Sequence, residues 1–564
     1  MRSRCRALAL IVATAMLSML PGMVDSPPAN ADPGVFATEP VTWRVTTSPV
    51  QVTELLDAGF DVAEYRDGDA FVLGDAAVAE RLRDRGLRPR FHDTVYKEVA
   101  DVTTAEDTFY GGYRTAAAHL AHLDTVAAAH PDLATVYDIG DSWRKTVGQG
   151  GHDIKAICIT ARQPGDCQLS PSSAKPRFSI ISQIHAREIA TGELTYRWID
   201  HLVNGYGTDT EITELLDTTE VWVVPIANPD GVDLVAAGGD RPVLHRKNAN
   251  TSHGSCSGTG RGVDLNRNHT FKWGGASSSP CAETYQGPRG ASEPEVVALE
   301  QFFAKIHPDQ RGPADTDPAP ADTRDTMISL HAYGNYVIHP WGWTANQMAP
   351  NAAALRALGT DMAQYNGYRV GTAPQTVGYT ATGSTDDFVY GAFGVAGYTF
   401  EVGSSWGTCG GFLPAYSCVD GTFWPANRDA FMTAAQAADS PYSDGDPGQP
   451  GDCVGAATTS VPLADRATTE SPVTVACERS ATSAAAVTVD ITHTYRGDLR
   501  IDLVAPDGSV YPLKSSSAWD GADDVRATYP VDLSAEAAGG TWTLRVADVY
   551  SGDTGTLNSW SVTL

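Results

Sequence analysis

The chain has 564 residues, more than one hydrophobic core usually holds, so about three domains are expected. Its 42% hydrophobic and 19% charged residues are typical of a globular protein and argue against a disordered one. With 40 basic and 68 acidic residues the net charge is −28, and no stripe of Lys or Arg is visible, which argues against nucleic acid and anionic membranes as partners.

The N-terminus has the pattern of a secretory signal peptide. Residues 1–6 are basic, residues 7–20 are apolar, and residues 29–31 read Ala-Asn-Ala, a small-x-small cleavage site. The apolar run has the length of a signal core and is short for a membrane span, which disfavours a membrane anchor as the alternative. We therefore predict a signal peptide over residues 1–31, a secreted, extracellular protein, and no membrane contact after signal removal.

Residues 32–105 are expected to form a small α/β unit. Strands are predicted over residues 41–45 and 70–73, and helices over residues 49–58 and 76–85. The unit precedes every residue with evident chemistry and contributes no obvious site of its own.

Residues 106–440 are expected to form an α/β domain around a central, largely parallel sheet. Several apolar runs lack polar alternation, as in strands that are covered on both faces. These runs are residues 156–159, 178–181, 221–224, 327–330 and 398–400, with helices predicted between them, for example over 193–203 and 293–306. In such a layout, functional sites lie at the carboxyl ends of the strands.

A linker and a third domain follow. Residues 441–451 are rich in Pro, Gly and Asp, the composition of a linker. Beyond them apolar residues alternate with polar ones, at 487–491, 499–503 and 542–546, and no helical period appears. A β-sandwich over residues 452–564 is therefore predicted.

The cysteines indicate disulfide bonds. Cys5 lies in the signal peptide and leaves eight cysteines, an even number in an exported chain. Pairing of nearest neighbours along the chain is the simplest hypothesis, but eight cysteines allow 105 connectivities, so the connectivity stays open. A cysteine metal site is the alternative, and it lacks any C-x-x-C spacing.

A possible metal site combines three residues. His185 follows an apolar strand and Glu188 opens a helix, so a turn could bring both to one point. An H-x-x-E pair alone is weak evidence, because a helix N-terminus favours a Glu in any case. His331 ends another apolar strand, and two His with one carboxylate leave a fourth zinc position free, the form of a catalytic site.

Further charged residues suggest catalysis. Glu401 lies inside an apolar strand, where a lone carboxylate is costly unless it has a partner, and it could take a proton from water. Arg246 and Arg267, in polar motifs, could bind a carboxylate or stabilise an oxyanion. Taken singly, each arginine is better explained as a surface ion pair.

In this order and spacing the motifs resemble the M14 zinc carboxypeptidases, particularly the bacterial secreted members similar to carboxypeptidase T. The resemblance covers about residues 106–440 and extends to residues 228–231, 271–274 and 285–288. It implies the zinc carboxypeptidase fold, a central mixed and largely parallel sheet flanked by helices, with one zinc ion per chain. The chain departs from the usual pattern at Phe388, where the family has Trp.

The resemblance implies roles for the metal-centre residues. His185, Glu188 and His331 match the zinc ligands. Glu401 matches the general base that activates the attacking water and then protonates the leaving amine. Arg246 matches the arginine that polarises the scissile carbonyl and stabilises its oxyanion.

The resemblance also implies roles in substrate binding. Asn266 and Arg267 match the pair that binds the terminal carboxylate, and Tyr379 matches the mobile tyrosine that closes on it. Arg187 matches a secondary substrate arginine. Asp386, seven positions after Tyr379, falls at the base of the pocket for the C-terminal side chain, as in the carboxypeptidase B type that prefers Lys or Arg. Two alternatives remain: Asp386 turns away to cap a turn, or the pocket also accepts apolar residues.

The flanking segments also resemble known modules. Residues 32–105 lie where the family carries an inhibitory propeptide, which implies an activating protease as a partner. Residues 452–564 resemble a P (Homo B) domain, a jelly-roll β-sandwich, most closely at residues 553–560. Calcium is left open, because no clear motif supports a site for it.

The sequence therefore predicts a secreted zinc metallocarboxypeptidase that acts on the C-termini of peptides and proteins. An amidase or peptidase acting on peptidoglycan stem peptides, with the same fold, is the first alternative. A secreted binding protein without catalysis is the second, and the complete set of zinc ligands with Glu401 argues against it.

Overall fold

The computed structural model describes residues 39–98, 107–442, 453–457, 460–475, 477, 481 and 485–564. The predicted signal peptide and most of the predicted linker lie outside these residues. Within them, no helix combines the length and apolarity needed to cross a membrane.

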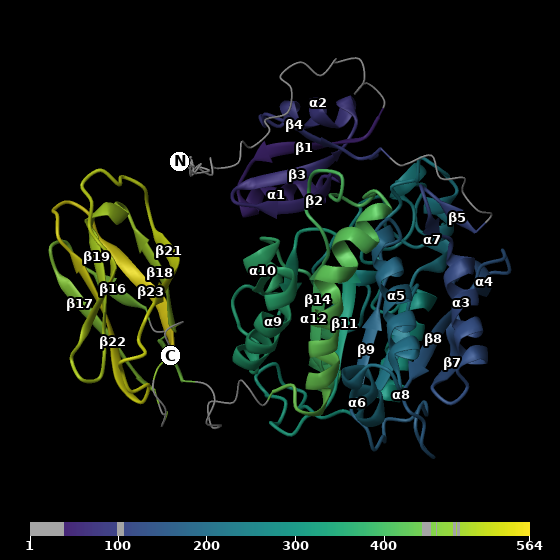
Figure 1. Ribbon diagram of the computed structural model, residues 1–564. Helices are drawn as coiled ribbons and strands as arrows, with labels where there is room; N and C mark the ends of the chain where they lie inside the picture. The colour runs from purple at the N-terminus through teal and green to yellow at the C-terminus, as the bar shows by residue number, and fades with distance from the viewer. Residues whose placement is uncertain are drawn as a thin grey trace, which may run out of the picture.

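The N-terminal unit is a four-stranded antiparallel sheet with two helices (Figure 1). Its strand order is β2-β3-β1-β4. The strands are β1 (Val41–Thr46), β2 (Asp61–Arg66), β3 (Asp69–Gly74) and β4 (Arg90–Thr94), and the helices are α1 (Pro49–Asp57) and α2 (Ala76–Asp84). The sequence predicted β1, β3 and both helices; β2 and β4 were not predicted.

The central domain contains an eight-stranded mixed sheet in the order β13-β12-β14-β11-β9-β10-β8-β7. The four central strands β14, β11, β9 and β10 are mutually parallel, and the antiparallel pairs lie toward the edges. The strands are β7 (Ala134–Asp141), β8 (Asp153–Ile159), β9 (Arg177–Ile181), β10 (Glu220–Val224), β11 (Thr326–His331), β12 (Tyr336–Ile338), β13 (Arg369–Gly371) and β14 (Ala396–Glu401). Each apolar run in the sequence is one of the strands β8, β9, β10, β11 and β14.

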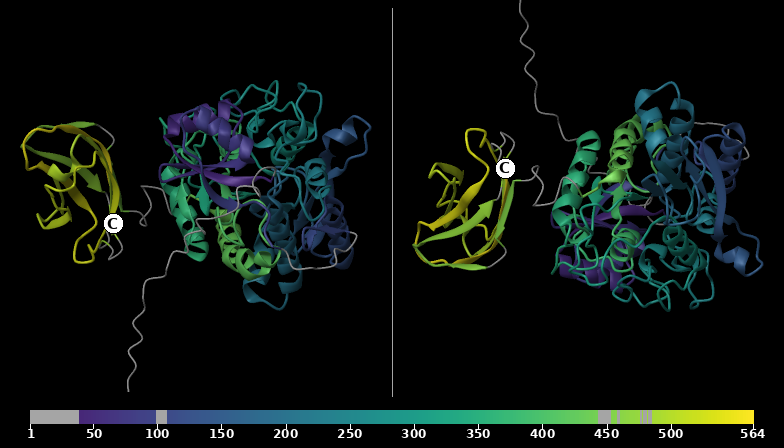
Figure 2. Two further views of the ribbon diagram at one scale, coloured as in Figure 1. Left: turned by 90° about the horizontal axis from the view of Figure 1, so that it is seen from above. Right: turned by 90° about the horizontal axis from the view of Figure 1, so that it is seen from below.

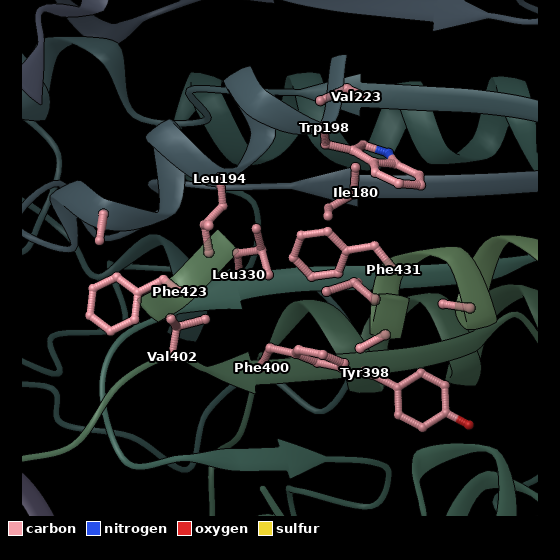
Figure 3. Packing of buried hydrophobic residues seen from close by; sticks show 14 of the residues in the cluster. Ile180, Leu194, Trp198, Val223, Leu330, Tyr398, Phe400, Val402, Phe423 and Phe431 are labelled. Carbon is pink, nitrogen blue, oxygen red and sulfur yellow. The ribbon is translucent and has the colours of Figure 1, made fainter. Parts of the chain in front are cut away.

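Helices cover both faces of this sheet, which explains why its strands read as continuous apolar runs. On β9, Ile180 belongs to a core cluster that includes residues of α3, α5, α9 and α12, and Figure 3 shows it near Trp198 of α5 and Phe431 of α12. Its neighbour Ile181 belongs to a second cluster, which includes residues of α8 and α11. These helices are α3 (Ala116–Ala129), α5 (Ile189–Gly205), α8 (Pro294–Ile306), α9 (Ala352–Asn366), α11 (Thr385–Phe393) and α12 (Trp424–Gln436). The remaining elements of the domain are α4 (Trp143–Thr146), α6 (Thr210–Thr218), α7 (Pro229–Ala236), α10 (Ala373–Thr376), β5 (Thr108–Phe109) and β6 (Tyr113–Arg114).

The C-terminal strands form two sheets with a separate hydrophobic core around Trp542 and Trp560. One sheet has the order β15-β23-β18-β21, with β16 also paired to β23, and the other has the order β17-β22-β19-β20. The strands are β15 (Val454–Ala457), β16 (Val461–Leu463), β17 (Thr468–Val475), β18 (Ala485–His493), β19 (Leu499–Val504), β20 (Val510–Lys514), β21 (Val525–Val531), β22 (Gly540–Asp548) and β23 (Gly555–Thr563). The predicted β-sandwich is confirmed.

Four disulfides join the eight cysteines in nearest-neighbour order. The pairs are Cys158–Cys167, Cys256–Cys281, Cys409–Cys418 and Cys453–Cys477. The simplest pairing hypothesis is therefore confirmed, and a metal site built from these cysteines is ruled out.

Candidate active site

Two candidate residues end neighbouring parallel strands. His331 is the last residue of β11 and Glu401 is the last residue of β14, and the two are register partners. Parallel register carries both side chains to the same edge of the sheet, where its carboxyl ends form a site.

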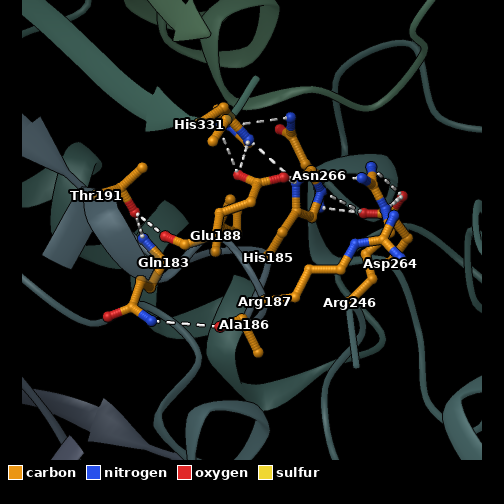
Figure 4. Close-up of polar contacts among 12 residues, drawn as sticks. Gln183, His185, Ala186, Arg187, Glu188, Thr191, Arg246, Asp264, Asn266 and His331 are labelled. Carbon is orange, nitrogen blue, oxygen red and sulfur yellow. Dashed lines mark hydrogen bonds and ion pairs between the residues drawn. The ribbon is translucent and has the colours of Figure 1, made fainter. Parts of the chain in front are cut away.

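A local turn brings the other two candidate ligands to that edge. After β9, Gln183 adopts a left-handed backbone conformation with φ 47°, which is uncommon for a residue with a side chain. Its N–H donates to the Thr191 hydroxyl at 3.2 Å, and this contact ties the turn to α5 (Figure 4). Glu188 is the residue that caps the start of α5. The turn therefore sets His185 and Glu188 against each other.

The side chains of His185, Glu188 and His331 converge on one point. Nδ1 of His185 lies 2.8 Å from Oε1 of Glu188 and 3.0 Å from Nδ1 of His331 (Figure 4). Nδ1 of His331 lies 3.1 Å from Oε2 of Glu188. All three residues are at most 3% exposed. Two imidazole nitrogens and a carboxylate, with ligand atoms within 4.8 Å of one another, are a donor set that suits zinc.

The hydrogen bonds and charges around these three residues also suit a bound zinc ion. Nε2 of His185 lies 3.0 Å from Oδ1 of Asp264, and an ionised carboxylate only accepts, so Nε2 carries the proton and the Nδ1 lone pair faces the other ligands. Burial lowers the pKa of His331, and the two imidazoles outweigh burial to hold the pKa of Glu188 far below its usual range. Neutral imidazole and ionised carboxylate are the states that bind a metal.

Asp264 was not predicted as a site residue, although it lies in the motif that supplied Asn266 and Arg267. Its Oδ1 also accepts the backbone N–H of Asn266 at 3.0 Å. Its Oδ2 accepts Nε and Nη2 of Arg246 at 3.1 and 2.9 Å. One buried carboxylate therefore orients both a metal ligand and an arginine. The sequence signal was an acidic residue next to two predicted binding residues.

Glu401 and Arg246 both face the pocket beside these ligands. Burial and the nearby Glu188 raise the pKa of Glu401 well above its usual range, while Arg246 and Arg267 oppose the shift. A carboxylate in this setting has a high proton affinity, as a general base requires.

Asn266 and Arg267 are also held in place. Oδ1 of Asn266 accepts the N–H and hydroxyl of Thr385 at 2.9 and 3.1 Å, which leaves its amide nitrogen directed toward Nε2 of His331 at 3.4 Å. Arg267 donates through Nη1 to the Asn266 carbonyl at 2.7 Å. With Tyr379, both side chains line the same pocket.

Asp386 lies in the first turn of α11 and also lines the pocket, only 3% exposed. Burial raises its pKa, and a hydrogen bond with Ser384 opposes that shift. Its neighbour Asp387 accepts the N–H groups of Gly342 and Trp343. The Asp386 carboxylate also hydrogen-bonds to the backbone of Asp386 and Asp387 at the start of α11, as the turn-capping alternative expects. Ala381 and Thr399 are further lining residues.

The N-terminal unit, which has no obvious site of its own, contributes side chains to this pocket. Leu56, Asp61, Val62 and Ala63 line the pocket together with the catalytic candidates, and the unit lies over the central domain (Figure 2). Asp61 forms a two-pronged ion pair with Arg187, with Nη2 and Oδ1 2.8 Å apart. No sequence pattern indicated this contact, because β2 has no apolar pattern and its partner lies 126 residues away.

The structure thus brings together all ten predicted site residues. Eight of them line one pocket, His331 contacts His185 behind it, and Arg187 binds Asp61 at its edge. Glu283, another pocket residue, was not predicted.

Comparisons with known proteins agree with this geometry. The model of the zinc carboxypeptidase family matches residues 119–422, over half of the chain, and that of the proprotein convertase P-domain matches residues 482–564. A zinc carboxypeptidase of Saccharothrix mutabilis subsp. capreolus is 27% identical over 401 residues, covering 66% of this chain and 84% of the relative. A transglutaminase-activating metalloprotease of Streptomyces mobaraensis is 54% identical over 107 residues, which are 19% of this chain and only 14% of that protein. The crystal structure of carboxypeptidase A from Helicoverpa armigera shares the fold, with a TM-score of 0.56 at 22% identity over 72% of this chain and 98% of that one.

Proposed function

The chain belongs to the zinc carboxypeptidase family, and we propose that its mature form is a secreted exopeptidase that releases single residues from the C-termini of peptides and proteins. The observation that carries this proposal is a single pocket. It combines a His-Glu-His zinc site, a carboxylate base and an Asn-Arg pair suited to a terminal carboxylate.

In the proposed mechanism, substrate binding is set by its free carboxylate. Arg267 and the amide of Asn266 bind that group, and the Tyr379 hydroxyl closes over it. Charge-assisted hydrogen bonds of this kind are short and directional, so they place the last peptide bond beside the metal ligands. An amidated C-terminus lacks the charge and would bind poorly.

The proposed chemistry then involves Glu401 and Arg246. Zinc held by His185, Glu188 and His331 would lower the pKa of a water molecule and polarise the scissile carbonyl. Glu401 accepts a proton from the attacking water and later delivers it to the leaving amine. Arg246, oriented by Asp264, stabilises the negative charge that develops on the carbonyl oxygen.

We further propose a preference for C-terminal Lys or Arg. The support is Asp386, a buried carboxylate that lines the pocket while Asp387 caps the adjacent loop. A cationic side chain would pair with Asp386, whereas an apolar one would leave that carboxylate desolvated without a cation.

The remaining segments complete the proposal. Residues 1–31 are a signal peptide, residues 32–105 an inhibitory propeptide, residues 106–440 the catalytic domain, residues 441–451 a linker and residues 452–564 the P domain. Latency is supported by the placement of residues 61–63 in the pocket and by the hydrogen bond of 2.7 Å from the Gly407 N–H to Asp93. A separate protease would release the propeptide.

The test uses the full chain before and after proteolytic trimming. A blocked dipeptide with a free C-terminal Arg should be hydrolysed only after trimming. This activity should be lost when the zinc is chelated and restored by stoichiometric zinc. Equal activity of the uncut and trimmed chains would remove the latency proposal. A trimmed protein that contains zinc but does not hydrolyse the substrate would contradict the proposed activity.

A further inference from the structure

Arg187 lies between two carboxylates that belong to different parts of the chain. Asp61, from the N-terminal unit, forms the two-pronged ion pair described above. Glu283, from the catalytic domain, places Oε2 3.9 Å from Nη1 of the same guanidinium. The Arg187 side chain is 1% exposed and that of Glu283 is 13% exposed, so solvent screens these charges little.

One carboxylate oxygen of Glu283 lacks a hydrogen-bond partner among the described residues. Its Oε2 is buried without a hydrogen-bond partner, and so is Nε of Arg187. Unpaired buried polar atoms are rare and costly, and they mark places where a second arrangement exists or strain is stored. The obvious second arrangement is a direct Arg187–Glu283 pair, which needs a shift of about one ångström and the departure of Asp61.

The other charges near Glu283 offer no such partner. The Lys247 ammonium donates to three backbone carbonyls, those of Gly260, Pro280 and Ala282, at 2.7 to 3.0 Å and is fixed there. Arg246 is bound to Asp264. Further charged or titratable groups line a second groove that Glu283 shares with the N-terminal unit: Asp75, Arg81, Tyr96 and Arg241.

We propose that Glu283 is the partner that Arg187 exchanges for Asp61 when the propeptide leaves. The Arg187 guanidinium lies over the ring of Phe412, 4.1 Å from its centroid, and Phe412 lines the substrate pocket. In the mature enzyme Glu283 then holds the guanidinium at this place. In the latent chain Glu283 competes with Asp61 for the Arg187 guanidinium and so weakens the Asp61–Arg187 ion pair. This inference rests on the proposed roles of residues 32–105 as a propeptide and of Arg187 as a substrate residue.

The exchange makes propeptide binding depend on pH. Burial, and then the negative charge of Asp61, raise the pKa of Glu283 to about 7 in the latent chain. Departure of the N-terminal unit removes the charge of Asp61, lessens the burial and gives Glu283 a cation, so the pKa of Glu283 falls in the mature enzyme. The latent form therefore binds more protons than the separated parts. Propeptide affinity is highest at acidic pH, falls as pH rises toward about 7, and is lowest and constant above it.

The experiment measures this affinity without relying on activity. The full chain is cut between the N-terminal unit and the catalytic domain, and the dissociation constant of the two pieces is measured by sedimentation from pH 5 to 8.5. The native chain is compared with Glu283→Gln, Asp61→Asn and the double variant. Glu80→Gln is the control, because this carboxylate of the N-terminal unit is exposed and, among the described residues, forms an ion pair with Arg83 of its own helix.

We expect Glu283→Gln to tighten the complex at pH 8 by about tenfold, the factor that corresponds to one pKa unit, and to flatten the pH dependence below pH 7. In the Asp61→Asn background the same substitution should have no such effect, which isolates the coupling between the two carboxylates. Weaker binding in Glu283→Gln, or an unchanged pH dependence, would overturn the exchange.

A second measurement addresses the mature enzyme. On peptides of four or more residues Glu283→Gln should raise KM several-fold more than it changes kcat, because Arg187 loses the group that positions it. If the native mature enzyme fails to hydrolyse any peptide, the proposed function fails, yet the sedimentation result still decides the exchange. An unchanged KM in the variant, with the native enzyme active, would overturn the positioning role alone.

Discussion

Replacing Asp264 by Asn tests whether one buried carboxylate organises the metal centre. Asp264 accepts from three neighbours, Nε2 of His185, the N–H of Asn266, and Arg246 through two nitrogens. An Asn side chain has one oxygen and one NH2 group, so in either orientation a donor faces a donor. If the NH2 group faces His185, the imidazole must change tautomer, and the lone pair on Nδ1 is lost to the metal.

The magnitude follows from these contacts. Loss of a carboxylate that orients a zinc-bound histidine lowers metal affinity by roughly 10- to 100-fold, or about 1.4 to 2.7 kcal/mol. Loss of the Arg246 contact should lower kcat/KM further, by roughly 100-fold if Arg246 stabilises the oxyanion.

The assay is zinc competition with a chromogenic chelator, alongside kcat/KM on a blocked dipeptide. Asp439→Asn is the control, since the Asp439 carboxylate is 73% exposed and far from the metal ligands in the sequence. Zinc affinity and kcat/KM both within twofold of the native enzyme would refute the organising role of Asp264.

Four further predictions concern single residues. His331→Ala should lose stoichiometric zinc and activity while circular dichroism shows a folded chain; a variant that still binds one zinc would contradict the ligand assignment. Glu401→Gln should keep zinc and substrate binding but lower kcat by about 10²- to 10⁴-fold, so near-normal kcat would refute the base role. Asp386→Ala should lower the ratio of kcat/KM for Arg over Leu substrates by about 100-fold, the loss of one or two charge-assisted hydrogen bonds, and an unchanged ratio would show that Asp386 does not contact substrate. Asp61→Ala should raise the activity of the uncut chain, because truncating one partner of a buried ion pair costs about 2 kcal/mol or more, and an unchanged latency would show that the contact is incidental.

The sequence predicted the metal ligands because each one is tied to a local pattern. His331 follows a short run of apolar residues of the kind that suits a strand covered on both faces, and functional sites form at the ends of such strands. The H-x-x-E spacing placed His185 and Glu188 on either side of a strand-to-helix turn. Both patterns involve residues close together in the sequence, so they could be recognised without knowing the tertiary structure.

The parts that were missed depend on contacts between distant segments. β2 reads Asp-Val-Ala-Glu-Tyr-Arg and has no apolar alternation, because it contacts polar and charged residues of the catalytic domain as well as its own sheet. Asp264 is adjacent to predicted binding residues, yet its hydrogen bond to His185 joins residues 79 positions apart in the sequence. No periodic pattern in the sequence predicts a contact of that range. The strand β13 at the edge of the sheet and its neighbour β12 are only three residues long and carry no pattern of their own.

The most direct test of carboxypeptidase activity compares two forms of one peptide. The trimmed, zinc-loaded protein is incubated with a peptide that ends in Arg, once with a free carboxylate and once amidated, and products are followed by mass spectrometry. The account predicts loss of a single Arg from the free acid and no cleavage of the amide, because the proposed binding by the pocket residues Asn266 and Arg267 requires the charge. Equal cleavage of both forms, or cleavage only at internal bonds, would contradict it.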